Sequence, residues 1–297
     1  MSSASNIKRT KTNKYFIMLR LLVLIFLFAF TTIVLAQKVI YSPRYFGPNA
    51  NQAAELTGAI IPEFTTVDFS GNYYFGFGDQ AINPELKIEI PLLPRKVSLK
   101  LWVALWEKYT VESAIYEERG MSKMEGITNG GDIYVQTRIS VFKEKKYRPA
   151  MILNSTLRSA SGGPIEERRY YDTPGYYFDV EAAKSFGFNN EIINDVRVSA
   201  DFGFLCWEMS NSKQSDAIMY GGKIILSNKA IDFEHTLAGY SGRINSDDEL
   251  LVYSAKLIGK TKPVSFFVQY KYGINDWNYH QLQAGISFQI KSLTPKY

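Results

Sequence analysis

Apolar and charged residues alternate along residues 84–111, and the alternation predicts a β-hairpin. The apolar Leu86, Ile88, Ile90 and Leu92 alternate with the charged Glu85, Lys87 and Glu89. After Pro94-Arg95-Lys96 the period of two resumes, with Val97, Leu99, Leu101, Val103 and Leu105 on one face and Ser98, Lys100, Trp102, Ala104 and Trp106 on the other. A period of two indicates strands with one apolar face. Long strands with a continuous polar face are typical of a barrel that crosses a bilayer, with lipid outside and water inside.

The same alternation recurs along the chain and predicts an all-β fold, a transmembrane antiparallel up-and-down β-barrel of about twelve strands. The hairpin supplies strands two and three. The other predicted strands span residues 64–77, 132–142, 147–159, 175–186, 194–209, 216–227, 231–241, 250–259, 263–273 and 279–290. A helical bundle is excluded for this part of the chain, because no segment after residue 36 has the roughly 20 apolar residues of a membrane-spanning helix.

The predicted connections alternate in length, and this sets the orientation of the barrel. Those after even-numbered strands are short, such as Pro94-Arg95-Lys96 and residues 228–230. Those after odd-numbered strands are mostly longer, up to roughly 20 residues at 112–131. Outer-membrane barrels have short turns in the periplasm and longer loops outside. Glu85 is therefore expected toward the outer mouth of the barrel, and Leu92 toward the periplasm.

Residues 1–36 have the three parts of an export signal peptide. Residues 21–35 are apolar, and Val34-Leu35-Ala36 is a small-residue cleavage site. The basic part contains Lys8, Arg9, Lys11, Lys14 and Arg20. An uncleaved membrane anchor is the alternative, because residues 16–36 approach the length that spans a bilayer.

The signal peptide also accounts for the charge of the chain. It contains five of the 34 basic residues and none of the 29 acidic residues, so the remainder is formally neutral. The formal net charge of +5 therefore does not indicate a nucleic acid or an anionic membrane surface as a partner.

Residues 37–62 precede the first predicted strand and show no period of two. They are polar, with proline and glycine recurring in Tyr41–Pro48. We interpret them as an N-terminal periplasmic tail or short cap, and a plug folded into the barrel mouth is the alternative. The predicted organisation is a signal peptide at 1–36, a tail or cap at 37–62 and an outer-membrane barrel at 63–297.

The sequence offers few side chains for catalysis or for binding a cofactor. His235 and His280 are the two histidines, and the strand pattern places both on the lipid or interface side. Neither is followed by serine, so the usual pattern of outer-membrane phospholipases is not seen. Walker, Rossmann, zinc and EF-hand spacings are absent, and the single Cys206 allows no internal disulfide. We expect no catalytic residue, no metal site and no cofactor, hence no enzyme.

The last predicted strand carries a resemblance to a known class of proteins. Residues 282–290 alternate apolar and polar, with Phe288 near the end and seven further residues after Ile290. This stretch resembles the C-terminal strand that the barrel-assembly machinery recognises. The chain thus resembles the outer-membrane β-barrel proteins of Gram-negative bacteria, which implies a location in the cell outer membrane.

A narrower resemblance covers about residues 130–186. The sequences at 130–134, 148–149, 161–163 and 168–179 are similar to uncharacterised exported barrels near the MetA-pathway phenol-degradation family. The resemblance implies a shared architecture and no particular activity.

Polar residues on the predicted inward faces are the main site candidates. They are Glu85, Lys87, Glu89, Lys100, Arg138, Asn154, Glu181, Arg197 and Asp201. The last five are expected near one another around the middle of the barrel. Such a ring can set the charge preference of a narrow pore. Alternatively, a small barrel fills its interior with paired charges, because a mid-plane Arg or Lys that faces lipid costs roughly 2 to 4 kcal/mol.

The predicted loop at 160–174 supplies further candidates. Residues 161–164 are glycine-rich, and residues 166–172 combine aromatic side chains with charges of both signs, including Arg168, Arg169 and Asp172. These residue types suit a constriction loop or a ligand contact. A packed external loop with local salt bridges is the alternative.

Two functions fit these features. The first is an outer-membrane channel or transporter for small solutes. The second is a non-conducting envelope or surface interaction barrel, with its lumen closed by salt bridges and by residues 37–62. The expected partners are outer-membrane lipid, the barrel-assembly machinery during biogenesis and, for a channel, a small-molecule solute. Nucleic acid is not expected.

Overall fold

A computed structural model describes residues 42–295, apart from residues 190, 210–212 and 244–246. The predicted signal peptide at 1–36 lies outside the described residues and stays a prediction. In the described part, no helix combines the length and the apolar character needed to cross a membrane.

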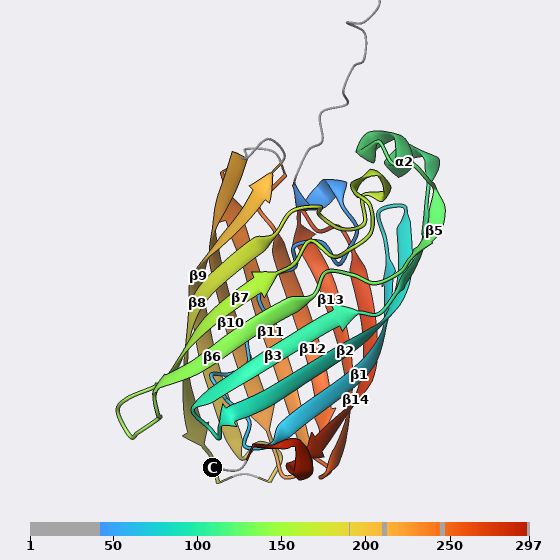
Figure 1. The fold of residues 1–297 in the computed structure, drawn as a ribbon. Helices are drawn as coiled ribbons and strands as arrows, with labels where there is room; N and C mark the ends of the chain where they lie inside the picture. The colour runs from blue at the N-terminus through green and yellow to red at the C-terminus, as the bar shows by residue number, and fades with distance from the viewer. Residues whose placement is uncertain (1–41, 190, 210–212, 244–246, 296–297) are drawn as a thin grey trace, which may run out of the picture. The chain divides into compact units, whose positions relative to one another are not determined.

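Fourteen strand segments form one antiparallel sheet that closes on itself (Figure 1), because β1 pairs with both β2 and β14. The strands are β1 (Thr65–Phe75), β2 (Asp79–Leu93), β3 (Val97–Ala104), β4 (Glu107–Val111), β5 (Glu125–Thr128), β6 (Tyr134–Phe142), β7 (Ala150–Arg158), β8 (Gly175–Gly187), β9 (Asp195–Met209), β10 (Lys213–Ser227), β11 (Ile231–Gly242), β12 (Leu251–Gly259), β13 (Val264–Asn275) and β14 (His280–Ile290). β4 continues β3 along β2, and β5 pairs with β4 as β6 pairs with β3. The barrel therefore has twelve strands, as predicted.

The two faces of the strands differ as the alternation predicts. On β8, Tyr176 and Phe178 are exposed, whereas Tyr177, Asp179 and Glu181 are buried. Large apolar side chains are exposed around the outside, among them Phe69, Phe202, Phe266 and Leu282. A continuous apolar outer face around a polar interior is the arrangement of a barrel that crosses lipid.

The inward position predicted for Trp106 is wrong. Leu105 and Trp106 interrupt the strand between β3 and β4, and both are exposed on the outside, Trp106 by 41%. Leu105 N donates to Pro84 O (2.9 Å), and Gly131 N donates to Ala104 O (2.8 Å). Two consecutive outward residues shift the alternation by one position, as in a β-bulge. Glu107 consequently points inward and is fully buried.

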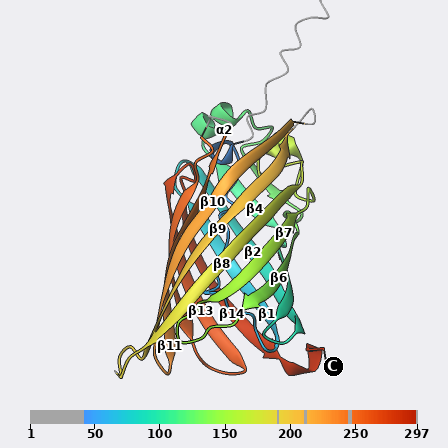
Figure 2. The ribbon, with the colours of Figure 1, turned by 90° about the vertical axis from the view of Figure 1, so that its left-hand side faces the viewer.

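The predicted alternation of connection lengths holds at one end of the barrel only. The turns 94–96, 143–149, 188–194, 228–230 and 260–263 lie at the end that carries the C-terminus, here called the short-turn end (Figures 1 and 2). Two long connections lie at the opposite, long-loop end. One contains helix α2 (Ser113–Arg119) and β5, and the other contains the 3₁₀ turn η2 (Ile165–Glu167).

Other connections at the long-loop end are short, contrary to expectation. β1 and β2 are joined by Gly76, Phe77 and Gly78 alone. All three residues have positive φ, and the two glycines adopt it without a steric penalty. The tight turn lets β2 begin at Asp79, five residues before the predicted hairpin.

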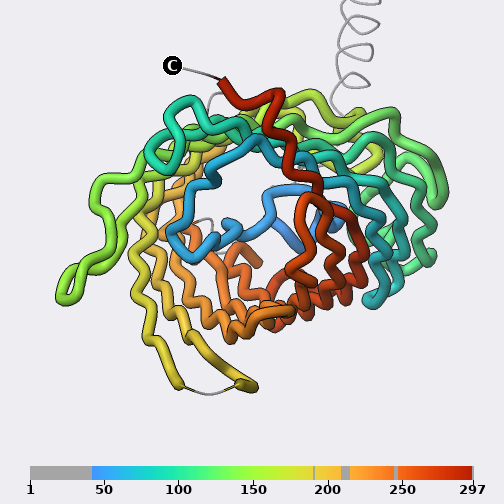
Figure 3. The backbone as a smooth tube through the Cα atoms, turned by 90° about the horizontal axis from the view of Figure 1, so that it is seen from below, coloured from blue at the N-terminus to red at the C-terminus, as the bar shows by residue number. Residues whose placement is uncertain are grey.

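Residues 42–62, here called the lumen segment, lie inside the barrel (Figure 3). Near its start is the 3₁₀ turn η1 (Pro43–Tyr45). At the long-loop end, Trp277 Nε1 donates to Pro48 O (3.0 Å). At the short-turn end, Arg95 N donates to Pro62 O (3.4 Å). The segment thus runs along the lumen from one end to the other.

This course corrects the interpretation of residues 42–62 as a tail or short cap and agrees with the alternative of a plug. Because the lumen wall is polar, a segment without regular secondary structure can satisfy its backbone groups there. Residues 37–41 lie outside the described part of the chain.

Candidate functional site in the barrel lumen

All nine predicted lumen residues lie on the inward faces of their strands. Arg138 is paired in register with Asn154, and Glu181 with Asp201. Asn154 Nδ2 donates to Asp179 Oδ2 (2.5 Å), and Asp179 precedes Glu181 on the inward face of β8, so the two pairs lie side by side on neighbouring strands. Four of the five residues expected at mid-barrel therefore come together. Arg197 lies nearer the short-turn end, opposite Ser185.

Glu181 of β8 holds the lumen segment through its backbone. The carboxylate accepts hydrogen bonds from Thr57 N (3.0 Å), Gly58 N (2.7 Å) and Thr57 Oγ1 (2.7 Å). Hydrogen bonds to an ionised acceptor are roughly twice as strong as neutral ones. Glu181 is almost fully buried, so these donors replace the water it would otherwise bind.

Two arginines on nearby strands, Arg138 of β6 and Arg197 of β9, hold the same stretch. Arg138 pairs with Glu89 (2.5 Å) and donates to Thr57 Oγ1 and to Ile60 O (2.9 Å). Arg197 donates to Gly58 O (2.6 Å). The wall therefore contacts the segment with a carboxylate that accepts from its N–H groups and guanidinium groups that donate to its carbonyls.

Glu144 supports Arg197 from the turn between β6 and β7. Arg197 Nη1 lies 2.6 Å from its carboxylate, and Lys184 Nζ lies 3.2 Å from it. Partial burial by itself raises the pKa of Glu144, but hydrogen bonds from Ser185 N, Arg197 and Lys184 outweigh it, and the pKa is lowered. Glu144 is thus an anion that fixes the arginine.

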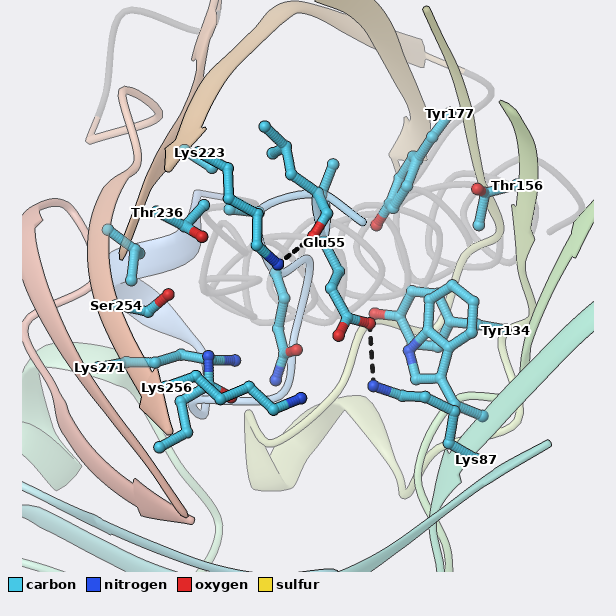
Figure 4. Close-up of a pocket in the computed structure, with 18 of the residues that line it drawn as sticks. Glu55, Lys87, Tyr134, Thr156, Tyr177, Lys223, Thr236, Ser254, Lys256 and Lys271 are labelled. Carbon is cyan, nitrogen blue, oxygen red and sulfur yellow. Dashed lines mark hydrogen bonds and ion pairs between the residues drawn. The ribbon is translucent and has the colours of Figure 1, made fainter. Parts of the chain in front are cut away.

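Nearer the long-loop end, Glu55 of the lumen segment pairs with lysines of the barrel wall (Figure 4). Glu55 lies 2.9 Å from Lys87 Nζ and 2.7 Å from Lys100 Nζ. Lys87 also lies 3.7 Å from Glu85. Lys223 donates to Leu56 O (2.9 Å) and pairs with Glu234 (2.7 Å). The predicted lumen charges are therefore bonded largely to the segment and to one another.

The loop candidate Arg169 lies at the centre of a buried charge network at the long-loop end. We call Asp79, Glu107, Arg119 and Arg169 the mouth cluster. Arg169 pairs with Asp79 (2.7 Å) and Glu107 (2.6 Å), and Arg119 pairs with Asp79 (2.6 Å). Tyr279 donates to Asp79 (2.6 Å). The side chains of Asp79, Glu107 and Arg169 are fully buried, and that of Arg119 is 2% exposed.

The lumen segment is part of the closure at this end. Asn49 Nδ2 donates to Glu107 Oε2. Gly47 N donates to Arg168 O (2.7 Å), and the Arg168 guanidinium lies over the Phe46 ring. A Cβ on Gly47 would lie 2.8 Å from the Arg169 guanidinium carbon, so glycine permits this close approach. The loop packs into the mouth and closes it.

Asp172, the third loop candidate, is exposed and lies outside the mouth cluster. Its neighbour Tyr171 is buried and stacks on Phe46, with ring centroids 4.1 Å apart. The buried part of the loop therefore ends at Tyr171, and Asp172 faces solvent.

A cavity of about 110 Å³ remains between the lumen segment and the wall. It is lined by Lys87, Lys100, Lys256 and Lys271, and Figure 4 shows Lys256 and Lys271 across the cavity from Lys87. A second cavity, of about 490 Å³, lies at the short-turn end, and Lys256 lines both. The lumen is thus not completely filled.

Several of these residues were not singled out from the sequence: Glu55, Asp79, Glu107, Arg119, Lys256 and Lys271. Asp79 precedes the predicted strand, and the bulge at Trp106 reversed the face expected for Glu107. A signal was present for Lys271, since the apolar face Val264 to Tyr272 leaves it on the inward face.

The two histidines lie on the outward face, as predicted. His235 Nδ1 lies 2.7 Å from Tyr253 OH, and His280 Nδ1 lies 2.7 Å from Tyr270 OH. Within the described ranges, no group of three or more His, Cys, Asp and Glu side chains could hold a metal ion. The expectation that the protein is not an enzyme stays a prediction.

Comparison with solved structures finds similar chains. The chain is similar to a NanC porin, with a TM-score of 0.50 and 11% identity over 75% of this chain and 100% of that chain. An outer membrane channel from Pseudomonas putida F1 gives a TM-score of 0.49 at 10% identity, over 81% and 98% of the two chains. The β domain of the Bordetella autotransporter BrkA gives 0.45 at 9% identity, over 76% and 99%.

The first of these likenesses shows the fold, an outer-membrane type β-barrel. No protein-family model matches the chain, and no curated protein matches its sequence. The narrower resemblance to barrels near the MetA-pathway phenol-degradation family therefore stays a prediction.

Proposed function

We propose that the protein is an outer-membrane channel for small solutes, closed in this structure by the lumen segment. One observation carries the proposal. The barrel closes through β1 pairing with β2 and β14, whereas the lumen segment contributes no strand. Its displacement would break hydrogen bonds and ion pairs with the wall and leave the barrel ladder intact.

The proposal includes the location and partners of the chain. The apolar outer face contacts outer-membrane lipid, and a small-molecule solute passes through the polar lumen. The signal peptide directs export, and β14 is the strand that the barrel-assembly machinery recognises.

A disulfide between the lumen segment and the wall tests whether the segment is the gate. A Cβ added at Gly221 of β10 would lie 2.7 Å from Leu56 Cδ1, so the two positions approach closely, and Leu56→Cys with Gly221→Cys is the pair chosen for cross-linking. The native Cys206 is replaced by alanine. In planar bilayers, we expect openings of the reduced full chain and none after oxidation.

The Cys206→Ala variant is the matched control, and its current should not change with oxidation. Equal currents from the oxidised and reduced tethered chain would show that the segment is not the gate. Glu181→Ala removes the acceptor for Thr57 and Gly58 and so loosens the segment. If the unmodified chain, the reduced variant and Glu181→Ala all fail to conduct, the channel proposal is wrong.

A non-conducting envelope or surface interaction barrel is the second candidate. The mouth cluster favours it, because opening the long-loop end would break buried ion pairs, which has a large free-energy cost. The same bilayer experiment separates the two functions.

A further inference from the structure

The structure assigns a class of solute to the lumen: we infer that it binds and passes small hydroxylated organic anions at Lys256 and Lys271. The inference rests on the proposed channel function. It starts from a difference among the lumen lysines. Lys87, Lys100 and Lys223 form ion pairs with carboxylates, whereas no ion pair in the described part of the chain includes Lys256 or Lys271. Glu55 acts on both of these lysines only at longer range, and Glu85 acts on Lys271 in the same way.

The two lysines are neighbours on the wall that faces the cavity. In the pairing of β12 with β13, Ser254 lies opposite Lys271 and Lys256 lies opposite Gln269. Figure 4 shows the Lys256 and Lys271 side chains close together on one side of the cavity. Lys256 Nζ also lies 4.3 Å from the centroid of the Phe267 ring, which holds the ammonium without neutralising it.

Unpaired charges at membrane depth are costly unless water or a ligand solvates them. Elsewhere in this lumen, the lumen segment supplies that partner, as Glu55 does for Lys87 and Lys100. An anion in the cavity would play the same role for Lys256 and Lys271. The remaining wall indicates the rest of the ligand.

Hydroxyl and amide groups surround the two lysines. The cavity is lined by the neutral Thr236, Ser254, Gln269 and Gln283. Its carboxylates already have other partners, since Glu55, Glu85 and Glu234 pair with Lys87 or Lys223 and Asp179 accepts from Asn154. Such groups both donate and accept hydrogen bonds, and therefore match the hydroxyls of a polar solute. Two ammonium groups beside neutral hydrogen-bonding groups match a small carboxylate that also carries hydroxyls.

The lysines also lie on a route from the short-turn end. Lys256 lines the cavity beside the lumen segment and also the larger cavity below it. Lys260 lines the larger cavity but pairs with Asp232 (2.7 Å). Lys262, in the exposed turn between β12 and β13, lines the larger cavity as well. An anion that enters there therefore passes Lys262 at the mouth and then reaches Lys256, beside Lys271.

Ion preference in planar bilayers tests the inference. The full chain is placed in a potassium chloride gradient, alone and with Glu181→Ala to loosen the lumen segment, and the reversal potential is measured. We expect a preference for chloride over potassium that Lys256→Gln with Lys271→Gln abolishes. Lys229→Gln, in an exposed turn, makes a single change of the same kind outside the lumen and should leave the preference unchanged.

Two further measurements separate charge from structure and define the ligand. Lys256→Arg with Lys271→Arg keeps both charges and should retain the chloride preference. Potassium gluconate, a hydroxylated carboxylate, should reduce the chloride current of the unmodified chain several-fold more than that of the glutamine variant. Chloride preference with no effect of gluconate overturns the assignment to hydroxylated anions.

The outcomes distinguish this inference from the proposed function. A conducting chain without anion preference, or one whose preference survives the glutamine variant, leaves the channel and overturns the anion site. A chain that never conducts overturns both.

Discussion

The long-loop end and the wall formed by β12 and β13 differ in whether their charged side chains form ion pairs. In the mouth cluster, Arg169 bridges Asp79 and Glu107, with all three side chains removed from solvent. On the wall, Lys256 and Lys271 line a cavity whose carboxylates Glu55, Glu85 and Glu234 are paired with other lysines, and no ion pair in the described residues includes Lys256 or Lys271. Mutual pairing makes the first region a structural closure. The lack of it leaves the second region available to a ligand.

The largest effect is expected from Arg169→Ala. The substitution leaves buried Glu107 without its ion-pair partner and Asp79 with Arg119 alone, and breaking a buried ion pair in this way costs about 3 to 5 kcal/mol. The free energy of unfolding, measured by urea titration of the protein in lipid vesicles, should fall by about that amount.

Lys123→Ala is the control for this prediction. Lys123 pairs with Glu167, but its side chain is 59% exposed, and exposed pairs are worth about 0 to 1 kcal/mol. Equal losses of stability from the two substitutions would contradict the structural role of the mouth cluster.

A smaller and different effect is expected from Glu181→Ala. The variant removes the acceptor for Thr57 and Gly58 while the barrel ladder stays intact. Hydrogen bonds to charged groups contribute about 1.5 to 3 kcal/mol each. The closed state should therefore lose at least about 1.4 kcal/mol, a tenfold rise in the open population, recorded as open probability in planar bilayers.

Glu191→Ala is the matched control, because Glu191 is an exposed carboxylate in the turn between β8 and β9. It should leave the open probability unchanged. A rise with both variants would indicate a general effect of charge, and no rise with Glu181→Ala would show that Glu181 does not hold the segment closed.

The same contrast explains how far the sequence could predict the structure. Lipid and water on opposite sides of a strand impose a local period of two, so the inward Asp179 and Glu181 and the outward Phe178 could be predicted from β8 alone. The bulge at Trp106 could not, because nothing in the local pattern shows an extra residue until Glu107 is seen on the buried face.

The lumen segment escaped prediction for a different reason. Thr57 and Gly58 carry ordinary backbone donors that water satisfies as well as Glu181 does. A polar segment without a period is therefore equally compatible with the periplasm and with a polar lumen. Its place depends on pairings far apart in sequence, such as Glu55 with Lys100. The inward-facing residues of the strands could be predicted from the sequence, but their partners in the lumen segment could not.

The smallest effect is expected from acid, at Glu144. Its pKa is lowered in the folded protein, because the hydrogen bonds from Ser185 N, Arg197 and Lys184 outweigh the opposing effect of burial. A lowered carboxyl pKa stabilises the folded state above the pKa of the unfolded chain, and this contribution is lost as the pH falls through the folded value. Arg197, which donates to Gly58 O, then loses its partner.

The unmodified chain should therefore open slightly more often as the pH falls below the ordinary glutamate range, beyond any change in Glu144→Gln. Because Glu144 is partly exposed, solvent and salt weaken the pair, and the difference should shrink at high ionic strength. Open probability measured from neutral to acidic pH, at low and high salt, checks both points. Identical pH profiles for the two proteins would show that Glu144 does not contribute to holding the lumen segment.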